Sequence, residues 1–382
     1  MPNLLRFLPE IFGIGLTLLC HGFLYRWAAA RWSSRKGWRL GWALSGIVSA
    51  AGLILNAPPV WRHLPPGPLF TWGRGMAILW GILACGTTIA LAVSRQMGRV
   101  APSTDLVRRG LLQAAQATVV AAPALAVGYG TFYERRRLTP LEIDLRIPGL
   151  PKDLDGLRIA QLSDIHLSSF LSAKELAAAV DMANTFRPHL AVVTGDLITR
   201  DGDPLDACLR ELRRLRAGDG VFGCMGNHEI YANCEAYTER EASKFGMRFL
   251  RGGAQTLRFG QAKLRLAGVD YQRSQTPYLA GAQALQEPGA FQVLLSHNPD
   301  VFDVAAAQGW DLTLAGHTHG GQVTVEYLNQ HLNLARFFTP YVYGHYEKEK
   351  SHLYVTRGIG TVGVPIRIGA APEVALVRLC AT

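Results

Sequence analysis

Charged residues are scarce in this 382-residue chain, at 18%, and acidic residues are nearly missing from its first third. Up to Arg137 there are 15 Lys and Arg but only three Asp and Glu. The six Cys follow no paired spacing, so the chain has no recognisable disulfide framework. Hydrophobic residues make up 49%, which excludes a disordered chain. No internal repeat or low-complexity linker interrupts the sequence.

Four stretches of the first third contain no charged residue, or only one. Each is close to the length of about 20 residues that a helix needs to cross a bilayer. They are residues 11–30 (with Arg26 near the end), 40–60, 75–94 and 110–133. Tryptophans gather near the ends of these runs, as aromatic side chains do at a membrane interface. A cleaved signal peptide would explain only the first run, and a soluble protein rarely has four such helices in succession. We therefore predict a transmembrane region of four helices over residues 1–137.

The loops between these spans carry similar amounts of positive charge. Eight Lys and Arg lie in the loops after the first and third spans, and six lie on the other side. The positive-inside rule then places both termini outside the cytoplasm. Within the spans His21 is an isolated polar residue, and there is no carboxylate to form a proton or ion path. The spans are therefore expected to be an anchor and not a transporter.

From Leu138 onward, short β-rich runs alternate with amphipathic helical stretches. Ser172-Ala-Lys-Glu175 predicts a capping box that opens a helix, and further helices are expected over 204–216, 233–245 and 299–308. Strands separated by helices favour an α/β fold in which helices cover a sheet, and the strand-rich end predicts a mixed or second sheet. The predicted strands are 158–163, 190–194, 221–225, 263–269, 291–296, 311–315, 353–356 and 373–379.

Polar side chains follow five of these strands at the point where each strand ends. All are types that ligate metals, and five of the chain's 11 His are among them. Ligands of such sheets bind beyond the carboxyl ends of the strands, and residues i and i+2 share one side of an extended chain. Simple capping of strand ends would not concentrate histidine in this way, so a metal site is predicted. Its candidate residues are Asp164 and His166, Asp196, Asn227 and His228, His297, and His317 and His319.

The ordered series Asp164-X-His166, Gly195-Asp196, Gly226-Asn227-His228-Glu229, His297 and Gly316-His317-X-His319 resembles the calcineurin-like metallophosphoesterase superfamily. The resemblance runs from about Arg158 to the C-terminus. The preceding spans, Gln322, and Thr356-Arg-Gly358-Ile-Gly360 resemble its bacterial membrane-associated branch, which includes phosphodiesterases and UDP-2,3-diacylglucosamine pyrophosphatases. The resemblance implies a four-layer α/β/β/α metallophosphoesterase sandwich over residues 138–382.

The resemblance also implies two divalent metal ions. Asp164, His166, Asp196 and His319 would hold the first ion, and Asp196, Asn227, His297 and His317 the second. Nitrogen and oxygen donors without cysteine favour Mn, Fe or Zn over Ca, and softness alone does not choose among them. Mn is expected first, with Fe, Zn or Mg as alternatives. Such a pair lowers the pKa of a shared water, and metal-bound hydroxide would attack phosphorus. Asp196 would bridge the ions as a catalytic residue. His228 would offset phosphoryl charge and protonate the leaving alkoxide, its alternative being a structural imidazole.

Other residues near the expected site have less specific signals. Asp270, Asn298 and Glu229 are candidate substrate contacts, with Glu229 alternatively orienting a neighbouring group and all three alternatively ordinary loop residues. Arg357 and Arg367 are expected to be surface arginines, the alternative being that they pair with phosphate. The apolar stretch Val323–Tyr346 is either sheet core or a lid that faces lipid.

These observations predict a membrane-tethered phosphoesterase acting on a phosphodiester or phosphomonoester, its substrate lipid-linked or part of the cell envelope. The alternative is a membrane sensor or transport regulator that binds ligand without turnover. The expected partners are the phosphoester, for which a membrane lipid is one candidate, and the bilayer itself. Because residues 138–382 are slightly acidic overall, no nucleic acid is expected. The expected location is a bacterial inner or plasma membrane, with the catalytic domain outside the cytoplasm.

Overall fold

The computed structural model describes residues 8–31, 36–56, 60, 67–100, 105–273, 278–327 and 330–382. The chain divides into two compact units. The first, the helical unit, comprises Met1–Tyr133 with Gly363–Ile366. The second, the α/β unit, comprises Glu134–Val362 and Arg367–Thr382.

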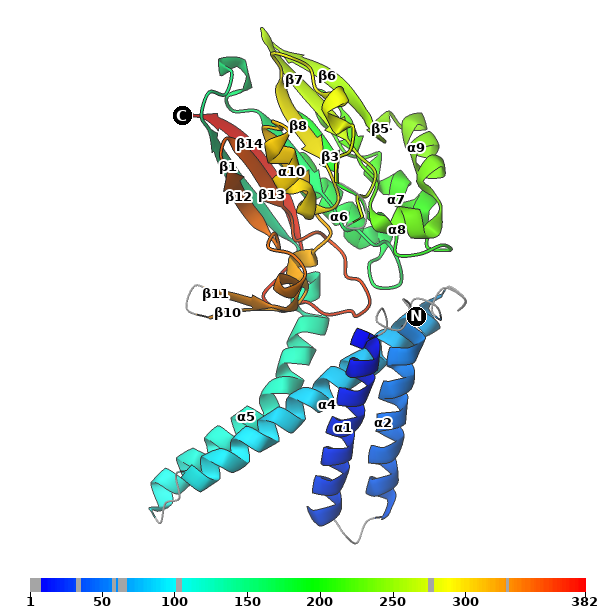
Figure 1. Cartoon of the computed structure of the whole chain (residues 1–382). Helices are drawn as coiled ribbons and strands as arrows, with labels where there is room; N and C mark the ends of the chain where they lie inside the picture. The colour runs from blue at the N-terminus through cyan, green and yellow to red at the C-terminus, as the bar shows by residue number, and fades with distance from the viewer. Residues whose placement is uncertain are drawn as a thin grey trace. The chain divides into compact units, whose positions relative to one another are not determined.

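The helical unit contains four long helices at the four apolar stretches of the sequence (Figure 1). Among the described residues, two helices are long and apolar enough to cross a membrane, over Pro68–Arg99 and Leu106–Arg136, and Leu40–Leu55 is a shorter apolar helix. The prediction of helices is confirmed, and the crossing of a membrane by all four stays a prediction. The helices are α1 (Leu8–Arg31), α2 (Lys36–Asn56), α4 (Pro68–Val100) and α5 (Leu106–Phe132).

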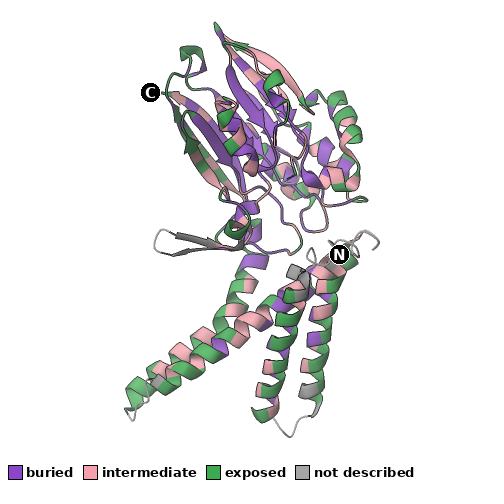
Figure 2. Ribbon diagram, in the orientation of Figure 1, coloured by how far each residue is buried: buried purple, intermediate pink, exposed green. Residues whose placement is uncertain are grey.

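Small and polar side chains hold these helices together. A Cβ added to Gly52 of α2 would overlap the Cβ of Ala77 in α4, so only glycine allows this approach. The prediction that His21 is isolated is wrong: its Nε2 atom lies 3.0 Å from the hydroxyl of Ser49 in α2, and both side chains are buried. Many large apolar residues of these helices are exposed, and Figure 2 colours much of the four helices as exposed.

The α/β unit contains two six-stranded mixed sheets and a two-stranded hairpin, which confirms the predicted α/β class. In the first sheet the order is β1-β14-β2-β3-β4-β5, and β2 to β5 run parallel. In the second the order is β12-β13-β9-β8-β7-β6, and β7, β8, β9 and β13 run parallel. The strands of the first sheet are β1 (Thr139–Ile147), β2 (Arg158–Leu162), β3 (Leu190–Val193), β4 (Val221–Gly223), β5 (Met247–Phe249) and β14 (Glu373–Ala381). Those of the second are β6 (Gly253–Phe259), β7 (Ala262–Gly268), β8 (Phe291–Leu295), β9 (Leu312–Ala315), β12 (Gly344–Lys348) and β13 (Ser351–Val355), and the hairpin is β10 (Thr324–Tyr327) with β11 (Gln330–Asn333).

The main apolar core lies between the two sheets. It joins Leu190 and Phe222 of the first sheet to Val293 and Leu314 of the second, all buried. Each such side chain contributes about 1.5–3 kcal/mol by leaving water. Further cores lie on the outer faces, beneath helices α6 (Ala173–Thr185), α7 (Leu205–Leu212) and α9 (Glu235–Lys244) on the first sheet and α10 (Phe302–Ala307) on the second (Figure 1).

The local sequence signals account for most of these elements. The capping box at Ser172 is confirmed: its hydroxyl accepts from the Glu175 N–H, and the Glu175 carboxylate accepts from the Ser172 N–H. All eight predicted strands are present with ends shifted by up to two residues. The sequence prediction missed β1, β5, β6, β10, β11 and β12 and the short helix α8 (Asn227–Ala232). The alternating apolar residues of β1 carry a period-two signal, but charged residues stand between them.

Candidate metal centre

Five loops at the carboxyl ends of strands bring the predicted metal-ligating side chains together. Asp164 and His166 follow β2, Asp196 follows β3, and Asn227 begins α8 after β4. From the second sheet His297 follows β8, and His317 and His319 follow β9. Because β2, β3 and β4 are parallel, as are β8 and β9, each sheet delivers its loops to a single edge.

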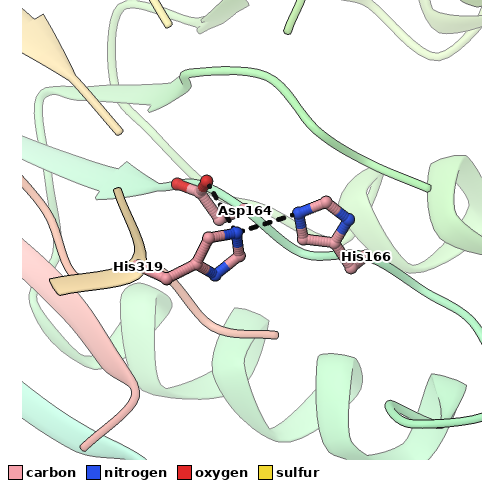
Figure 3. A group of neighbouring side chains, drawn as sticks. All are labelled: Asp164, His166 and His319. Carbon is pink, nitrogen blue, oxygen red and sulfur yellow. Dashed lines mark hydrogen bonds and ion pairs between the residues drawn. The ribbon is translucent and has the colours of Figure 1, made fainter. Parts of the chain in front are cut away.

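The first group contains Asp164, His166 and His319 (Figure 3). The Nε2 atom of His319 lies 3.1 Å from Nε2 of His166 and 3.4 Å from Oδ1 of Asp164. Asp164 and His166 are fully buried. Three potential ligand atoms are therefore held within reach of one cation.

The second group contains Asp196, His297 and His317. Oδ2 of Asp196 lies 3.0 Å from Nε2 of His297, and Nδ1 of His317 lies 3.2 Å from the same nitrogen. Oδ2 of Asp196 is also 3.4 Å from Nε2 of His166 in the first group. Asp196 thus stands between the two groups, where a carboxylate can serve both.

The side-chain oxygen of Asn227 indicates whether the donor atoms at this site suit a cation. Its Oδ1 atom is buried and has no hydrogen-bond partner in the described part of the chain. A buried amide oxygen without a partner is costly, and metal ligation would offset that cost. Oxygen from Asp and Asn with imidazole nitrogen, and no thiolate, fits hard to borderline divalent ions. The residues present therefore fit the two ions that the resemblance implies.

The backbone around these side chains is strained. Asp164, His166, Asp196, His317 and His319 have φ between 48° and 75°, and they are five of the ten non-glycine residues with positive φ in the described chain. Such residues cost free energy unless their surroundings hold them, and they concentrate at functional sites. Gly360 packs against this backbone, where an added Cβ would overlap the carbonyl oxygen of Ile165.

Hydrogen bonds to the far side of the imidazole rings set their orientation. Nδ1 of His297 donates to the Thr194 carbonyl at 2.7 Å, and Nδ1 of His166 lies 3.2 Å from the Thr199 hydroxyl. These contacts leave the Nε2 atom of each ring facing the centre, as metal-ligating histidines require.

Burial and the neighbouring charges favour the metal-binding protonation state of His166, His317 and Asp196, but not that of His297. Burial, aided by the charge of His228, lowers the pKa of His166 to about 3, and burial lowers the pKa of His317 to about 3. Although burial opposes it, the nearby His297 and His228 hold the pKa of Asp196 well below its usual range. Burial likewise opposes a proton on His297, but Asp196 raises the His297 pKa to about 10. A cation on His297 therefore has to displace a proton.

His228 lies at the rim of the centre. Its side chain is 12% exposed, its Nδ1 donates to the Thr199 carbonyl at 2.5 Å, and its Nε2 is 4.0 Å from Oδ2 of Asp196. The ring also packs edge-on against His166, with 4.7 Å between centroids. Nε2 is therefore the atom available to a reacting group.

The three candidate substrate contacts are all engaged within the protein. Glu229 is fully buried and accepts from the backbone N–H of Asp196, Leu197 and Gly226 at 2.7–2.9 Å. Burial, together with the Asp196 charge, raises the Glu229 pKa to about 7. This carboxylate joins the Asp196 and Asn227 loops, which favours the alternative of an orienting group, and a substrate contact at Glu229 stays a prediction.

Asp270 and Asn298 also have partners within the protein. The Asp270 carboxylate accepts from Nε and Nη2 of Arg251 at 2.8–3.1 Å. The Asn298 amide donates to the Gln272 carbonyl and accepts from the Asp300 N–H. A substrate contact at either residue stays a prediction.

Two residues of the site were missed by the sequence analysis. The ring of Tyr271 lies 5.3 Å from that of His317 and 6.1 Å from that of His297. It follows the end of β7 closely, so the strand-end pattern could have found it. The expectation that Arg367 is a surface arginine is wrong: it is fully buried, and its guanidinium donates to the carbonyls of His319, Gly358, Gly360 and Ala370.

The stretch Val323–Tyr346 contains the β10–β11 hairpin and a short 3-10 helix, Leu334–Phe337. Phe337 and Phe338 are 83% and 82% exposed, so the expectation of sheet core is wrong for this turn. Leu328 lies outside the described residues. The remaining expectation, a lid that faces lipid, stays a prediction.

Comparison with known proteins agrees with this geometry. The family model of calcineurin-like phosphoesterases matches residues 157–321, which include all seven predicted metal ligands. The uncharacterized metallophosphoesterase YkuE of Bacillus subtilis is 29% identical over 258 residues, covering 67% of this chain and 90% of its own length. The Bos taurus protein named transmembrane protein with metallophosphoesterase domain is 28% identical, covering 72% of this chain and 64% of its own. Phosphodiesterase YaeI of Escherichia coli is 27% identical, covering 71% of this chain and 98% of its own length. Residues 157–321 of the chain therefore form a calcineurin-like phosphoesterase domain, and the chain is similar to proteins named metallophosphoesterases.

Proposed function

We propose that this protein is a membrane-tethered phosphoesterase that uses two divalent cations, Mn first among them, to hydrolyse a phosphodiester or phosphomonoester. The observation that carries the proposal is the convergence of Asp164, His166, Asp196, His297, His317 and His319 from four strand ends, with Asn227 following a fifth. The name of the Escherichia coli relative, a phosphodiesterase, supports the same reaction class.

The residues have separate tasks in this proposal. Asp164, His166 and His319 would hold one cation and Asn227, His297 and His317 the other, with Asp196 shared. When bound, the two cations polarise the phosphoryl oxygens and activate a water. His228 holds a proton at Nε2 for the leaving oxygen, while its bond from Nδ1 to Thr199 keeps the ring in position. Glu229 and Arg367 keep the loops of the centre in place.

The substrate is proposed to be a lipid-linked or cell-envelope phosphoester. Two helices are apolar and long enough to cross a membrane, and a relative is named a transmembrane protein. A tether confines the site to a membrane surface and raises the effective concentration of a substrate there. The proposed division is an anchor over residues 1–137 and a catalytic domain over 138–382. The catalytic domain would lie outside the cytoplasm, in a bacterial inner or plasma membrane.

Hydrolysis of bis-p-nitrophenyl phosphate by the detergent-purified full chain with added Mn²⁺ tests the reaction. We expect turnover that a chelator removes and that Asp196→Asn abolishes, together with loss of bound metal. Asp181→Asn, which changes an exposed carboxylate of α6, is the matched control and is expected to keep full activity. Absence of hydrolysis with every divalent metal in folded protein would contradict the proposal and favour a sensor that binds without turnover.

A further inference from the structure

A second cluster of metal-ligating side chains lies on the β12–β13 hairpin, outside the centre already described. It consists of His345 and Glu347 of β12 and His352 of β13. Glu347 is paired directly with His352, and His345 lies two residues before Glu347. Because paired residues and residues two apart share a face of a sheet, all three side chains stand on the same face.

The ligand atoms are spaced as a single cation needs them. Nε2 of His345 lies 3.0 Å from Nδ1 of His352, and Oε1 of Glu347 lies 3.6 Å and 3.8 Å from these two nitrogens. Two ligands of a tetrahedral ion at about 2.0–2.1 Å are roughly 3.3 Å apart. The corresponding distances between ligand atoms in the centre itself are 3.0–3.4 Å. The hairpin cluster is therefore nearly as compact as the centre.

The cluster is buried on one side and exposed on the other. The His352 side chain is 4% exposed, whereas those of His345 and Glu347 are 26% and 62% exposed. The two rings stack with 5.3 Å between centroids and 11° between planes, which fixes both. The neighbouring Lys348 is one residue out of phase and is paired with Asp303, so its charge does not occupy the cluster. A cation can enter from solvent and keep a water ligand.

We propose that His345, Glu347 and His352 form a further metal site for one borderline-soft divalent cation, Zn²⁺ in the first place. Two imidazoles and one carboxylate with an open fourth position are a common donor set for zinc. Burial lowers the pKa of both histidines, which supports neutral rings. The ion would link the edge strand β12 to β13, and β13 leads into the loop whose Gly360 N–H donates to the Asp164 carbonyl.

Zinc binding to the full chain, purified in detergent without a polyhistidine tag, tests this site. Equilibrium dialysis followed by metal analysis should find one Zn²⁺ fewer per chain in His345→Asn than in the unchanged protein. Glu347→Gln should weaken binding of the same ion at least about tenfold. Glu349→Gln is the matched control, since it removes a carboxylate from the same hairpin outside the cluster, and it should keep the full number of ions.

The same comparison in the Asp196→Asn background separates this site from the proposed phosphoesterase centre. In that background, the chain with His345→Asn should still bind one Zn²⁺ fewer than the chain that keeps His345. This difference should not depend on how many ions the phosphoesterase centre still binds. Equal zinc content with and without His345→Asn overturns the proposal in either background. Because Glu347→Gln is conservative and exposed, a loss in both variants but not in Glu349→Gln cannot come from misfolding.

Discussion

The two units of this protein differ in which side chains they expose and which they bury. Most of the exposed large apolar side chains belong to the helical unit, where Leu69 and Leu106 are 81% and 82% exposed. The α/β unit instead buries charged and polar groups, among them Asp164, Glu229 and Arg367. An extensive exposed apolar surface marks contact with a membrane or a partner, whereas buried charges that are fully paired mark a site.

This contrast shows where each unit is sensitive to substitution. In the α/β unit the buried side chains of Asp164, Glu229 and Arg367 are each held by several hydrogen bonds, so removing one leaves its partners unsatisfied. In the helical unit an exposed apolar side chain has few protein contacts to lose. The effect of substituting it therefore depends on whether water or lipid surrounds it.

The largest effect is expected at the rim of the metal centre. His228→Ala should lower kcat/KM for bis-p-nitrophenyl phosphate by about 10²–10⁴-fold, because it removes the proton donor. The metal content should stay unchanged, since the proposed ligands remain. His189→Asn, which alters a histidine bonded to the Arg158 N–H away from the centre, is the control. Loss of metal from His228→Ala would instead identify His228 as a ligand.

Arg367→Met should destabilise the α/β unit by about 3 kcal/mol or more, because it leaves four carbonyls without their donor. Arg378→Met removes an exposed ion pair with Asp144 and should destabilise the protein much less, because solvent screens the pair. Thermal unfolding followed by circular dichroism compares the two variants. An equal loss of thermal stability in the two variants would show that the buried guanidinium of Arg367 stabilises the fold no more than an exposed one.

A charge on the outward face of α4 tests the helical unit. Ile89, which is 64% exposed, should tolerate Ile89→Leu, whereas Ile89→Arg should lower the membrane-bound fraction because arginine costs about 3 kcal/mol in a bilayer. The specific activity of the purified protein should not change. Fractionation of cells measures the membrane-bound fraction of each variant. An unchanged fraction in Ile89→Arg would argue against a lipid-facing α4.

The smallest effect concerns pH. Burial raises the pKa of Asp203 to about 6 although its carboxylate accepts from the Thr199 and Arg200 N–H groups. Between the unfolded value of about 4 and the folded value the folded state binds more protons, so stability falls as pH rises, by at most about 1.4 kcal/mol per pH unit. Asp203→Asn should therefore make the fall of the unfolding free energy between pH 4 and pH 7 less steep. Unfolding curves measured across this range check this, and an unchanged slope in the variant would assign the fall to another group.

Much of the site could be predicted from the sequence because its signals are local. Asp164 with His166 and His317 with His319 are pairs at i and i+2, and each follows a strand that its own residues specify. The capping box at Ser172 is likewise complete within four residues. The residues that support the site carry no such signal. Glu229 contacts Asp196 across 33 positions, and Arg367 contacts His319 across 48.

The sequence by itself determined the α/β class, the series of metal-ligating residues and the apolar helices, because periodicity, strand-end residues and charge-free length are properties of neighbouring residues. The burial of Glu229 and Arg367 as supports, and the meeting of His345, Glu347 and His352, depend on the tertiary structure. The reason is physical: burial and ligand spacing depend on which strands pair and in what register, and no short segment contains that information.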